Sequence, residues 1–301
     1  MEIFNRIVSI ILPVFLIVAV GYAYARLRGE IVKQDIGSIN RASVELLCPL
    51  LLFSALAAKE FDLVANLPLM LAGALIGLGS GLIAWPVARL LGYDLRTFLP
   101  PMMYNNCGNM GLPLAVLAFG SAALSEAVAL FMAGSLVYFT VGMRLMESGR
   151  TGGRKAKLNL FANPMMVAMI AGMVFAAFKF SLPDALMRAL RLLGEASIPL
   201  MLLALGVRMS DVTMRSWRIG LVGAVVCPLS GLAVAWLLDF VLPLTSLQRG
   251  QMYLFAGLPP AVFCFMVAER YKQEPEQVAA IVMLGNLASL GFVPLALWLG
   301  M

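Results

Sequence analysis

Three asparagines stand close together inside one strongly apolar stretch of this sequence. They are Asn105, Asn106 and Asn109, and they come just before Gly111 and Pro113. An amide side chain has both donors and acceptors, so it can bind a carboxylate or coordinate a cation. Polar groups in such a stretch are functional candidates by default, and the alternative is that they pair with freed backbone groups. We take all three as candidate substrate contacts, with Asn109 first because it lies nearest to the Gly-Leu-Pro sequence that follows.

The tripeptide Gly-Leu-Pro occurs twice, and several residues after it recur at the same spacing. The first copy runs from Gly111 to Pro113, and the second runs from Gly257 to Pro259. Proline lacks an N–H and fits best in the first turn of a helix, while glycine supplies flexible backbone just before it. We therefore predict that two apolar helices are interrupted and that new half-helices start at Pro113 and Pro259.

These predicted breaks have a chemical consequence. Unpaired backbone groups are costly in lipid, so a break survives only where it faces protein or a water-filled cavity. The positive N-termini of the two half-helices would meet there and favour an anionic group such as a carboxylate. An ordinary proline kink without a ligand is the alternative. Gly111, Pro113, Gly257 and Pro259 therefore join the substrate-contact candidates.

Two further amides lie in other apolar stretches. Asn286 is a candidate substrate contact, and its alternative role is a hydrogen bond between helices. Gln251 lies in the stretch that precedes the second Gly-Leu-Pro, and we count it as a candidate for binding a coupling ion.

Two glutamates occupy matching sequence contexts. Glu45 and Glu195 each stand four residues before a proline and four residues after an arginine, Arg41 or Arg191. A buried carboxylate has a raised pKa and can carry a proton, so both are coupling-ion candidates. The alternative is a structural ion pair with the arginine on the same helix face. Glu126 is expected at the end of a span, in solvent.

The composition places these residues in a membrane protein. The chain of 301 residues is 61% hydrophobic and 13% charged, with a mean hydropathy of +0.92. Continuous apolar runs without the alternation of a transmembrane barrel predict an all-α polytopic membrane protein, a single membrane domain over 1–301. The ten candidate spans are 5–25, 38–58, 66–91, 97–119, 123–145, 160–180, 186–207, 217–238, 247–268 and 277–300.

The positive charges divide unevenly between the two sides of this layout. The loops after odd-numbered spans hold fifteen lysines and arginines, and the densest cluster runs from Arg150 to Lys157. The loops on the other side hold Lys59, Lys179, Arg188, Arg191 and Arg249, with Arg6 at the N-terminus. The positive-inside rule then predicts both termini outside the cytoplasm. Topology alone explains the net charge of +6, so nucleic acid is not an expected partner.

The sequence repeats itself at an offset of about 150 residues. The pattern Arg-x3-Glu-x3-Pro-Leu-x-Leu begins at Arg41 and again at Arg191, and further matches follow in the same order. Each repeat holds five spans, 1–147 and 159–301. An odd number of spans forces the second repeat to enter from the opposite side, which predicts two inverted five-helix repeats with broken helices 4 and 9.

The stretch from Asn105 to Leu114 resembles the fourth-helix motif of the auxin efflux carrier family, in its bacterial permease branch. The segment from Asn40 to Phe53 resembles that family's second helix, and the ten-span layout covers the whole chain. The resemblance implies a scaffold of spans 1, 2, 6 and 7 and a mobile transport domain of spans 3–5 and 8–10. It also implies an elevator-type secondary transporter, a homodimer in the bacterial inner membrane, that moves a small organic anion such as a mono- or dicarboxylate.

Several alternatives stay open. A sodium-coupled carrier of the bile-acid type shares a similar architecture, and a ligand sensor could reuse the fold without transport. An enzyme is not expected, because the chain has no histidine and each lysine lies at or beyond the end of a span. The four cysteines form no C-x-x-C pair, so neither a metal nor a cofactor is expected. The coupling ion, Na+ or H+, and uniport remain alternatives.

Overall fold

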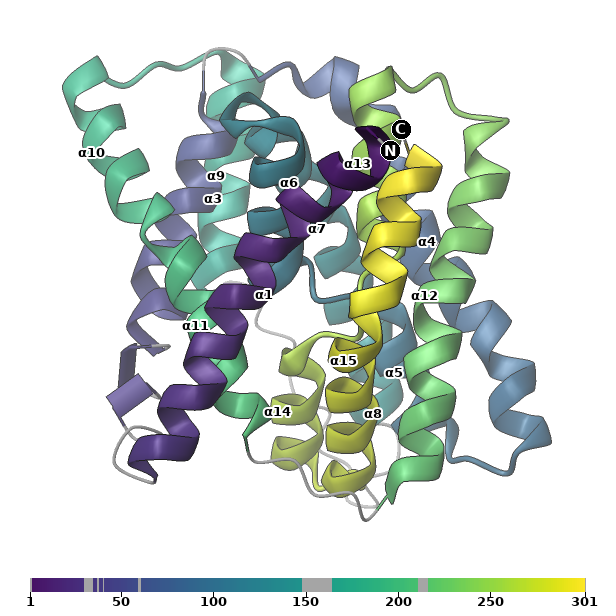
Figure 1. Ribbon diagram of the computed structural model, residues 1–301. Coiled ribbons are helices and arrows are strands. Elements are labelled where there is room, and N and C mark those ends of the chain that lie inside the picture. Colours follow the sequence, from purple (N-terminus) through teal and green to yellow (C-terminus); the bar gives the residue numbers. More distant parts are fainter. Residues whose placement is uncertain are drawn as a thin grey trace.

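The computed structural model describes residues 2–29, 35–36, 38–39, 41–58, 61–147, 164–210 and 216–300. In this described part every regular segment is a helix. The central basic cluster from Arg150 to Lys157 and the start of the expected span at 160–180 lie outside the described residues. Both ends of the chain lie at the same end of the helical bundle (Figure 1).

The first half of the chain forms long helices and several shorter ones. Its elements are α1 Glu2–Arg28, η1 Ser43–Leu47, α3 Cys48–Leu56, α4 Leu63–Leu90, α5 Leu95–Met103, η2 Cys107–Gly111, α6 Leu112–Phe119, η3 Ser121–Ala123, α7 Leu124–Val137, η4 Tyr138–Gly142 and α8 Met143–Glu147. Elements η1, η2 and η4 are π-helical turns, and η3 is a 3₁₀ turn.

The second half continues in the same manner. Its elements are α9 Pro164–Phe178, α10 Asp184–Glu195, α11 Ser197–Met209, α12 Trp217–Asp239, α13 Ser246–Ala256, α14 Val262–Tyr271 and α15 Pro275–Gly300. The expected spans 66–91, 217–238 and 277–300 agree with α4, α12 and α15 to within three residues at each end.

Polar residues mark where several of these helices begin. The Asp62 carboxylate accepts hydrogen bonds from the first turn of α4, and Asp94 does the same for α5. Thr245 and Gln248 form a reciprocal capping box at the start of α13. Arg96 also donates to Asp94, with Nη2 2.6 Å from Oδ2, and this hydrogen bond holds the pKa of Asp94 below its usual range. Each cap satisfies N–H groups that a helix start leaves without intrahelical partners.

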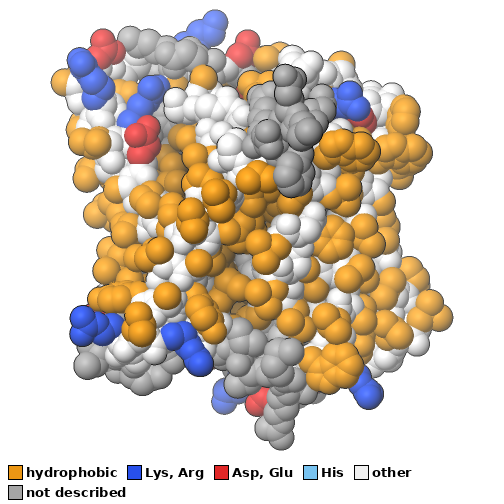
Figure 2. Space-filling model, in the orientation of Figure 1, with side chains coloured by type: hydrophobic (Ala, Val, Ile, Leu, Met, Phe, Trp, Pro, Cys, Tyr) orange, Lys and Arg blue, Asp and Glu red, His pale blue; other side chains and the backbone are white. Residues whose placement is uncertain are grey.

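The surface of the bundle is suited to lipid. Figure 2 shows apolar side chains across the middle of one face, with charged side chains gathered toward its two ends. Leu82, Trp236 and Trp298 expose 74%, 55% and 59% of their surface. Six helical stretches of the described chain are long and apolar enough to cross a membrane, and the ten-span count stays a prediction. Those stretches are Val8–Arg28, Leu63–Leu90, Ser121–Met146, Asp184–Met209, Trp217–Asp239 and Pro275–Gly300.

The helices pack into two groups. In one group α1 packs against α11, and α3 packs against both α9 and α10. In the other group α4 packs against α5, α7 and α12, while α15 packs against α12, α13 and α14. Elements η2 and α7 bring the second group into contact with the first, through α11 and α3. A boundary between the groups therefore runs past the middle of α5–α6.

A glycine contact sets the closest approach within the first group. Gly21 on α1 faces the backbone of Leu203 and Gly206, and Gly206 faces the backbone of Val18 and Tyr22. A side chain at either glycine would meet a backbone carbonyl oxygen, which cannot rotate away. Small residues thus allow α1 and α11 to pack backbone against backbone.

We expect Gly206→Ala to destabilise the protein by about 2 kcal/mol, because the added methyl group forces two helix backbones apart. The matched control is Gly291→Ala on α15, where a Cβ meets open space and helix propensity favours alanine. The measurement is thermal unfolding of the two purified variants in detergent. Equal melting temperatures for both would contradict the close contact.

Candidate functional site

Two helices of the second group are interrupted near their middles. The first runs as α5 to Met103 and resumes at Cys107, and the second runs as α13 to Ala256 and resumes at Val262. In Figure 1, α5 lies toward the lower end and α6 toward the upper end, whereas α13 lies above α14. The two interrupted helices therefore run in opposite directions.

The two interruptions meet and pair. Asn105 and Pro260 form an antiparallel β-bridge. The backbone N–H of Asn106 donates to the carbonyl of Pro259 at 2.7 Å, and the N–H of Ala261 donates to the carbonyl of Tyr104 at 2.9 Å. Each break thus satisfies backbone groups that the other leaves without helical partners.

The breaks differ from their predicted positions, and the prediction that half-helices start at Pro113 and Pro259 was wrong. The first half-helix starts at Cys107 and continues through Pro113, which lies in the first turn of α6. The π-helical turn η2 ends two residues before this proline, and such a widened turn accommodates a ring that would clash in a regular α-helix. The second half-helix starts at Val262, after Ala261 in extended backbone. Pro260 disfavours helical backbone at Pro259, so the helix cannot readily start there.

Two of the three asparagines are held by other parts of the protein. The Nδ2 group of Asn105 donates to the carbonyl of Phe255 at 2.8 Å, and the Cys227 thiol lies 3.4 Å from its Oδ1. The Nδ2 group of Asn106 donates to Oδ1 of Asn286 at 3.0 Å, and Asn286 in turn donates to the carbonyl of Val282. Asn105 therefore caps the end of α13, and Asn106 ties the crossing to α15.

Asn109 is different. It is partly exposed and makes no side-chain hydrogen bond within the described part of the chain. It lies in η2, the first turn after the break, and it lines a cavity of about 550 Å³. Its amide is therefore available to a molecule in that cavity.

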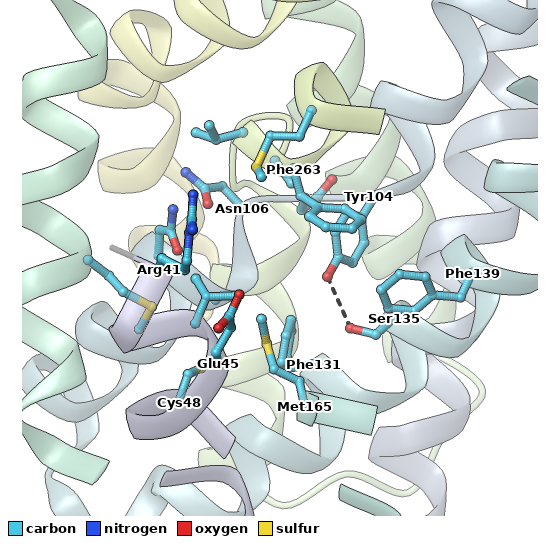
Figure 3. Close-up of a pocket in the computed structure, with 18 of the residues that line it drawn as sticks. Arg41, Glu45, Cys48, Tyr104, Asn106, Phe131, Ser135, Phe139, Met165 and Phe263 are labelled. Carbon is cyan, nitrogen blue, oxygen red and sulfur yellow. Dashed lines mark hydrogen bonds between the residues drawn. The ribbon is translucent and has the colours of Figure 1, made fainter. Parts of the chain in front are cut away.

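The cavity lies where the two breaks cross and where the two helix groups face each other. Figure 3 shows Arg41 and Glu45 extending into it from η1 and the preceding turn, with Asn106 nearby and Tyr104 across from them. Asn105, Asn106, Gly108 and Asn109 line the side of the first break, and Ala261, Val262 and Phe263 line the side of the second. Its volume falls within the range of small-molecule sites.

The first turns of both half-helices thus face the cavity. Gly108 and Asn109 belong to the first turn after one break, and Val262 and Phe263 to the first turn after the other. Helix geometry leaves the N–H groups of a first turn without intrahelical acceptors, and the dipole makes this end positive. The arrangement favours an anion.

Three charged side chains line the same cavity. They are Arg41, Glu45 and Arg208, so among the described residues that line the cavity guanidinium groups outnumber carboxylates. In the described chain neither Glu45 nor Glu195 is within ion-pair distance of the arginine four residues before it. The structural-pair alternative is therefore absent in this structure. Glu195 is exposed at the end of α10 and does not line the cavity.

The remaining candidates lie away from the cavity. Gly111 packs against Phe255 and Leu258, Gly257 ends α13 beside Ala296, and Pro113 is buried in α6. Pro259 contributes its carbonyl to the bridge. These residues shape the crossing and do not face the cavity.

Gln251 is buried in α13, in the half of the helix above the crossing. Its Nε2 group donates to the carbonyl of Ala123 at 3.1 Å and to the Glu126 carboxylate at 3.0 Å. The expectation that Glu126 is solvated was wrong, since Glu126 is partly buried and paired with this amide. No cluster of three metal-ligating side chains occurs in the described chain.

Several residues that line the large cavity were not predicted from the sequence. Tyr104 stacks on Tyr138 with ring centroids 4.3 Å apart and shares a hydrogen bond with Ser135. Arg208 is one of the fifteen positive residues assigned to loops from the sequence, and in the structure it lines the cavity. Met165, Met169, Met201 and Met266 complete much of the apolar wall. Tyr104 directly precedes the asparagines, but methionines in apolar helices carry no comparable signal.

Asn105 and Asn109 should differ in their effect on stability. Asn105→Leu leaves the carbonyl of Phe255 without its side-chain donor and is expected to cost about 1–3 kcal/mol. Asn109→Leu removes no hydrogen bond of the described structure and is expected to leave the melting temperature nearly unchanged. Thermal unfolding of both purified variants tests this, and equal losses would contradict the distinction.

The whole chain is similar to known membrane transporters. It is 26% identical to a protein of Rhizobium meliloti named "Putative malonate transporter", with 98% of this chain and 96% of the relative covered. It is also 26% identical to an "Uncharacterized transporter" of Methanothermobacter thermautotrophicus, with 95% of each covered. A family model described as "Membrane transport protein" matches residues 6–299. The chain therefore belongs to this family of membrane transporters, the auxin efflux carrier-like family that its fourth-span motif resembles.

Proposed function

We propose that this transporter is a secondary carrier for a small organic anion bearing one or two carboxylates. The observation that supports this most is the cavity at the crossing of two interrupted helices, where Asn109 and two arginines face the same space. A guanidinium binds a carboxylate through two parallel hydrogen bonds, and an amide adds a further donor. The name of the Rhizobium relative favours a dicarboxylate such as malonate.

The proposed architecture has ten spans in two inverted five-helix repeats, 1–147 and 159–301. Two features support it. The interrupted helices run in opposite directions, and equivalent helix pairs recur, since α4 packs on α7 as α12 packs on α15. Likewise α1 packs on α11 as α9 packs on α3. Helices of the same repeat position thus have corresponding neighbours.

The proposed mechanism is elevator-type alternating access. The scaffold comprises spans 1, 2, 6 and 7, which form the first helix group, and the transport domain comprises spans 3–5 and 8–10, which form the second. The cavity lies between these groups, so movement of one group past the other would carry Asn109 and the crossing from one side to the other. A homodimer in the bacterial inner membrane, with both termini outside the cytoplasm, belongs to the same proposal.

The first test is thermal stabilisation of the purified protein by a panel of mono- and dicarboxylates that includes malonate. A ligand that binds only the folded state at 100 times its Kd adds about 2.7 kcal/mol of apparent stability. We expect at least one carboxylate to raise the melting temperature in parent protein and to lose this effect in Asn109→Leu. Neutral amides of the same acids serve as controls.

Two results would overturn the proposal. One is the absence of stabilisation across the panel. The other is equal stabilisation by carboxylates and by their neutral amides, because the site would then ignore the negative charge.

Glu45 is the coupling group that this proposal favours, with H+ as the ion. Among the described residues that line the cavity, Glu45 is the one with a carboxylate, and Arg41 lines the cavity with it. Glu195 and Gln251 lie elsewhere. A protonatable group at the site can link substrate movement to a proton gradient.

We expect Glu45→Gln to keep carboxylate exchange but to lose acceleration of uptake by an inward proton gradient. Reconstituted vesicles with and without a pH gradient provide the measurement, and Glu195→Gln is the matched control. Acceleration of equal size in parent and Glu45→Gln would exclude Glu45, and dependence on Na+ alone would replace H+ by Na+.

A further inference from the structure

A second cavity lies at the opposite end of the same helices. It has a volume of about 430 Å³. Two arginines and one carboxylate of α10 line it, Arg188, Arg191 and Asp184, together with Ala57 and Ala58, which follow α3. The large cavity touches the start of the η1–α3 segment and the end of α11, at Arg208. The second cavity touches the residues that follow α3 and the part of α10 from Asp184 to Arg191. The two cavities therefore lie toward opposite ends of this helix group.

Each cavity receives one arginine of the repeated pattern. Arg41 and Arg191 begin the two copies of Arg-x3-Glu-x3-Pro-Leu-x-Leu. The segments that carry them cross closely, because Gly194 of α10 packs on the backbone of Leu51 in α3. Arg41 faces the large cavity and Arg191 faces the second one. The repeat thus places a matched guanidinium on each side of the crossing point of the two segments.

We propose that Arg41 and Arg191 are side-specific contacts for the substrate carboxylate. Arg41 serves an anion that arrives at the end where α11 finishes, and Arg191 serves one that arrives at the end where α10 begins. The inference rests on the proposed function, and it adds the residues that recognise the anion in each of the two access states.

The physical reason lies in which group carries which side chain. Asn109 belongs to the helix group that contains the crossing, whereas Arg41 and Arg191 belong to the other group. If the two groups slide past each other, a guanidinium fixed on one group can face the anion in only one of the two positions. A second guanidinium at the other end restores the same charge-assisted contact after the movement. Without it, the anion would lose that contact in one state.

Arginine suits a carboxylate contact at both positions. The planar guanidinium offers parallel donors to a carboxylate, whereas lysine offers a compact point charge. In the described chain Arg41 makes no ion pair with the glutamate one turn away, so its donors face the cavity contents.

The test is malonate exchange in vesicles that contain protein of one verified orientation. Radiolabelled malonate is varied on one face at a time, and the KM on each face is measured for parent, Arg41→Gln and Arg191→Gln. We expect Arg41→Gln to raise the KM about tenfold or more on the face where α11 finishes, as loss of a charge-assisted hydrogen bond predicts, with little change on the other face. Arg191→Gln should show the opposite pattern.

Arg218→Gln is the matched control, because Arg218 stacks on Trp217 and its KM on both faces should stay at the parent value. Arg41→Lys and Arg191→Lys preserve the charge and keep the test valid if a glutamine variant fails to fold. They should show the same sidedness with a smaller change.

The outcomes distinguish a failure of the side-specific assignment from a failure of the proposed function. Equal effects of either arginine variant on both faces, or no effect on either, overturn the side-specific assignment while carboxylate transport stands. Absence of saturable exchange in the parent protein, for malonate and for every carboxylate of the stabilisation panel, overturns the proposed function and this inference with it.

Discussion

The organisation of this transporter depends on the need to satisfy backbone groups at two helix breaks deep inside an apolar bundle. A lone break would leave N–H and C=O groups without partners and without water. Here the break at Tyr104–Asn106 and the break at Pro259–Ala261 satisfy each other through two backbone hydrogen bonds. Each break therefore depends on the other for the hydrogen-bond partners of its backbone groups.

Side chains around the crossing add further hydrogen bonds that hold it together. Asn105 closes the end of α13, and Asn106 is tied through Asn286 to α15. These contacts use two of the three neighbouring amides for structure and leave Asn109 toward the cavity. All three asparagines line the cavity, but two of them use their amides to hold the crossing and Asn109 does not.

Much of the helical layout could be predicted from apolar run length, and the existence of two breaks could be predicted from the paired Gly-Leu-Pro sequences. The position of the first break could not, because a π-helical turn lets the chain remain helical through Pro113. The cavity wall was also beyond sequence reasoning. Arg208 looked like a loop charge, and only tertiary packing shows that the end of α11 reaches the same space as Arg41.

The glycine contact between α1 and α11 has an effect at some distance from where it occurs. Gly206 lies two residues before Arg208, so the spacing of the two helix backbones also sets where that guanidinium stands. The electrostatic potential inside the cavity is thus positioned by a contact that contains no polar side chain. Evolution could retune anion selectivity here by altering helix spacing, while every residue that faces the anion stays the same.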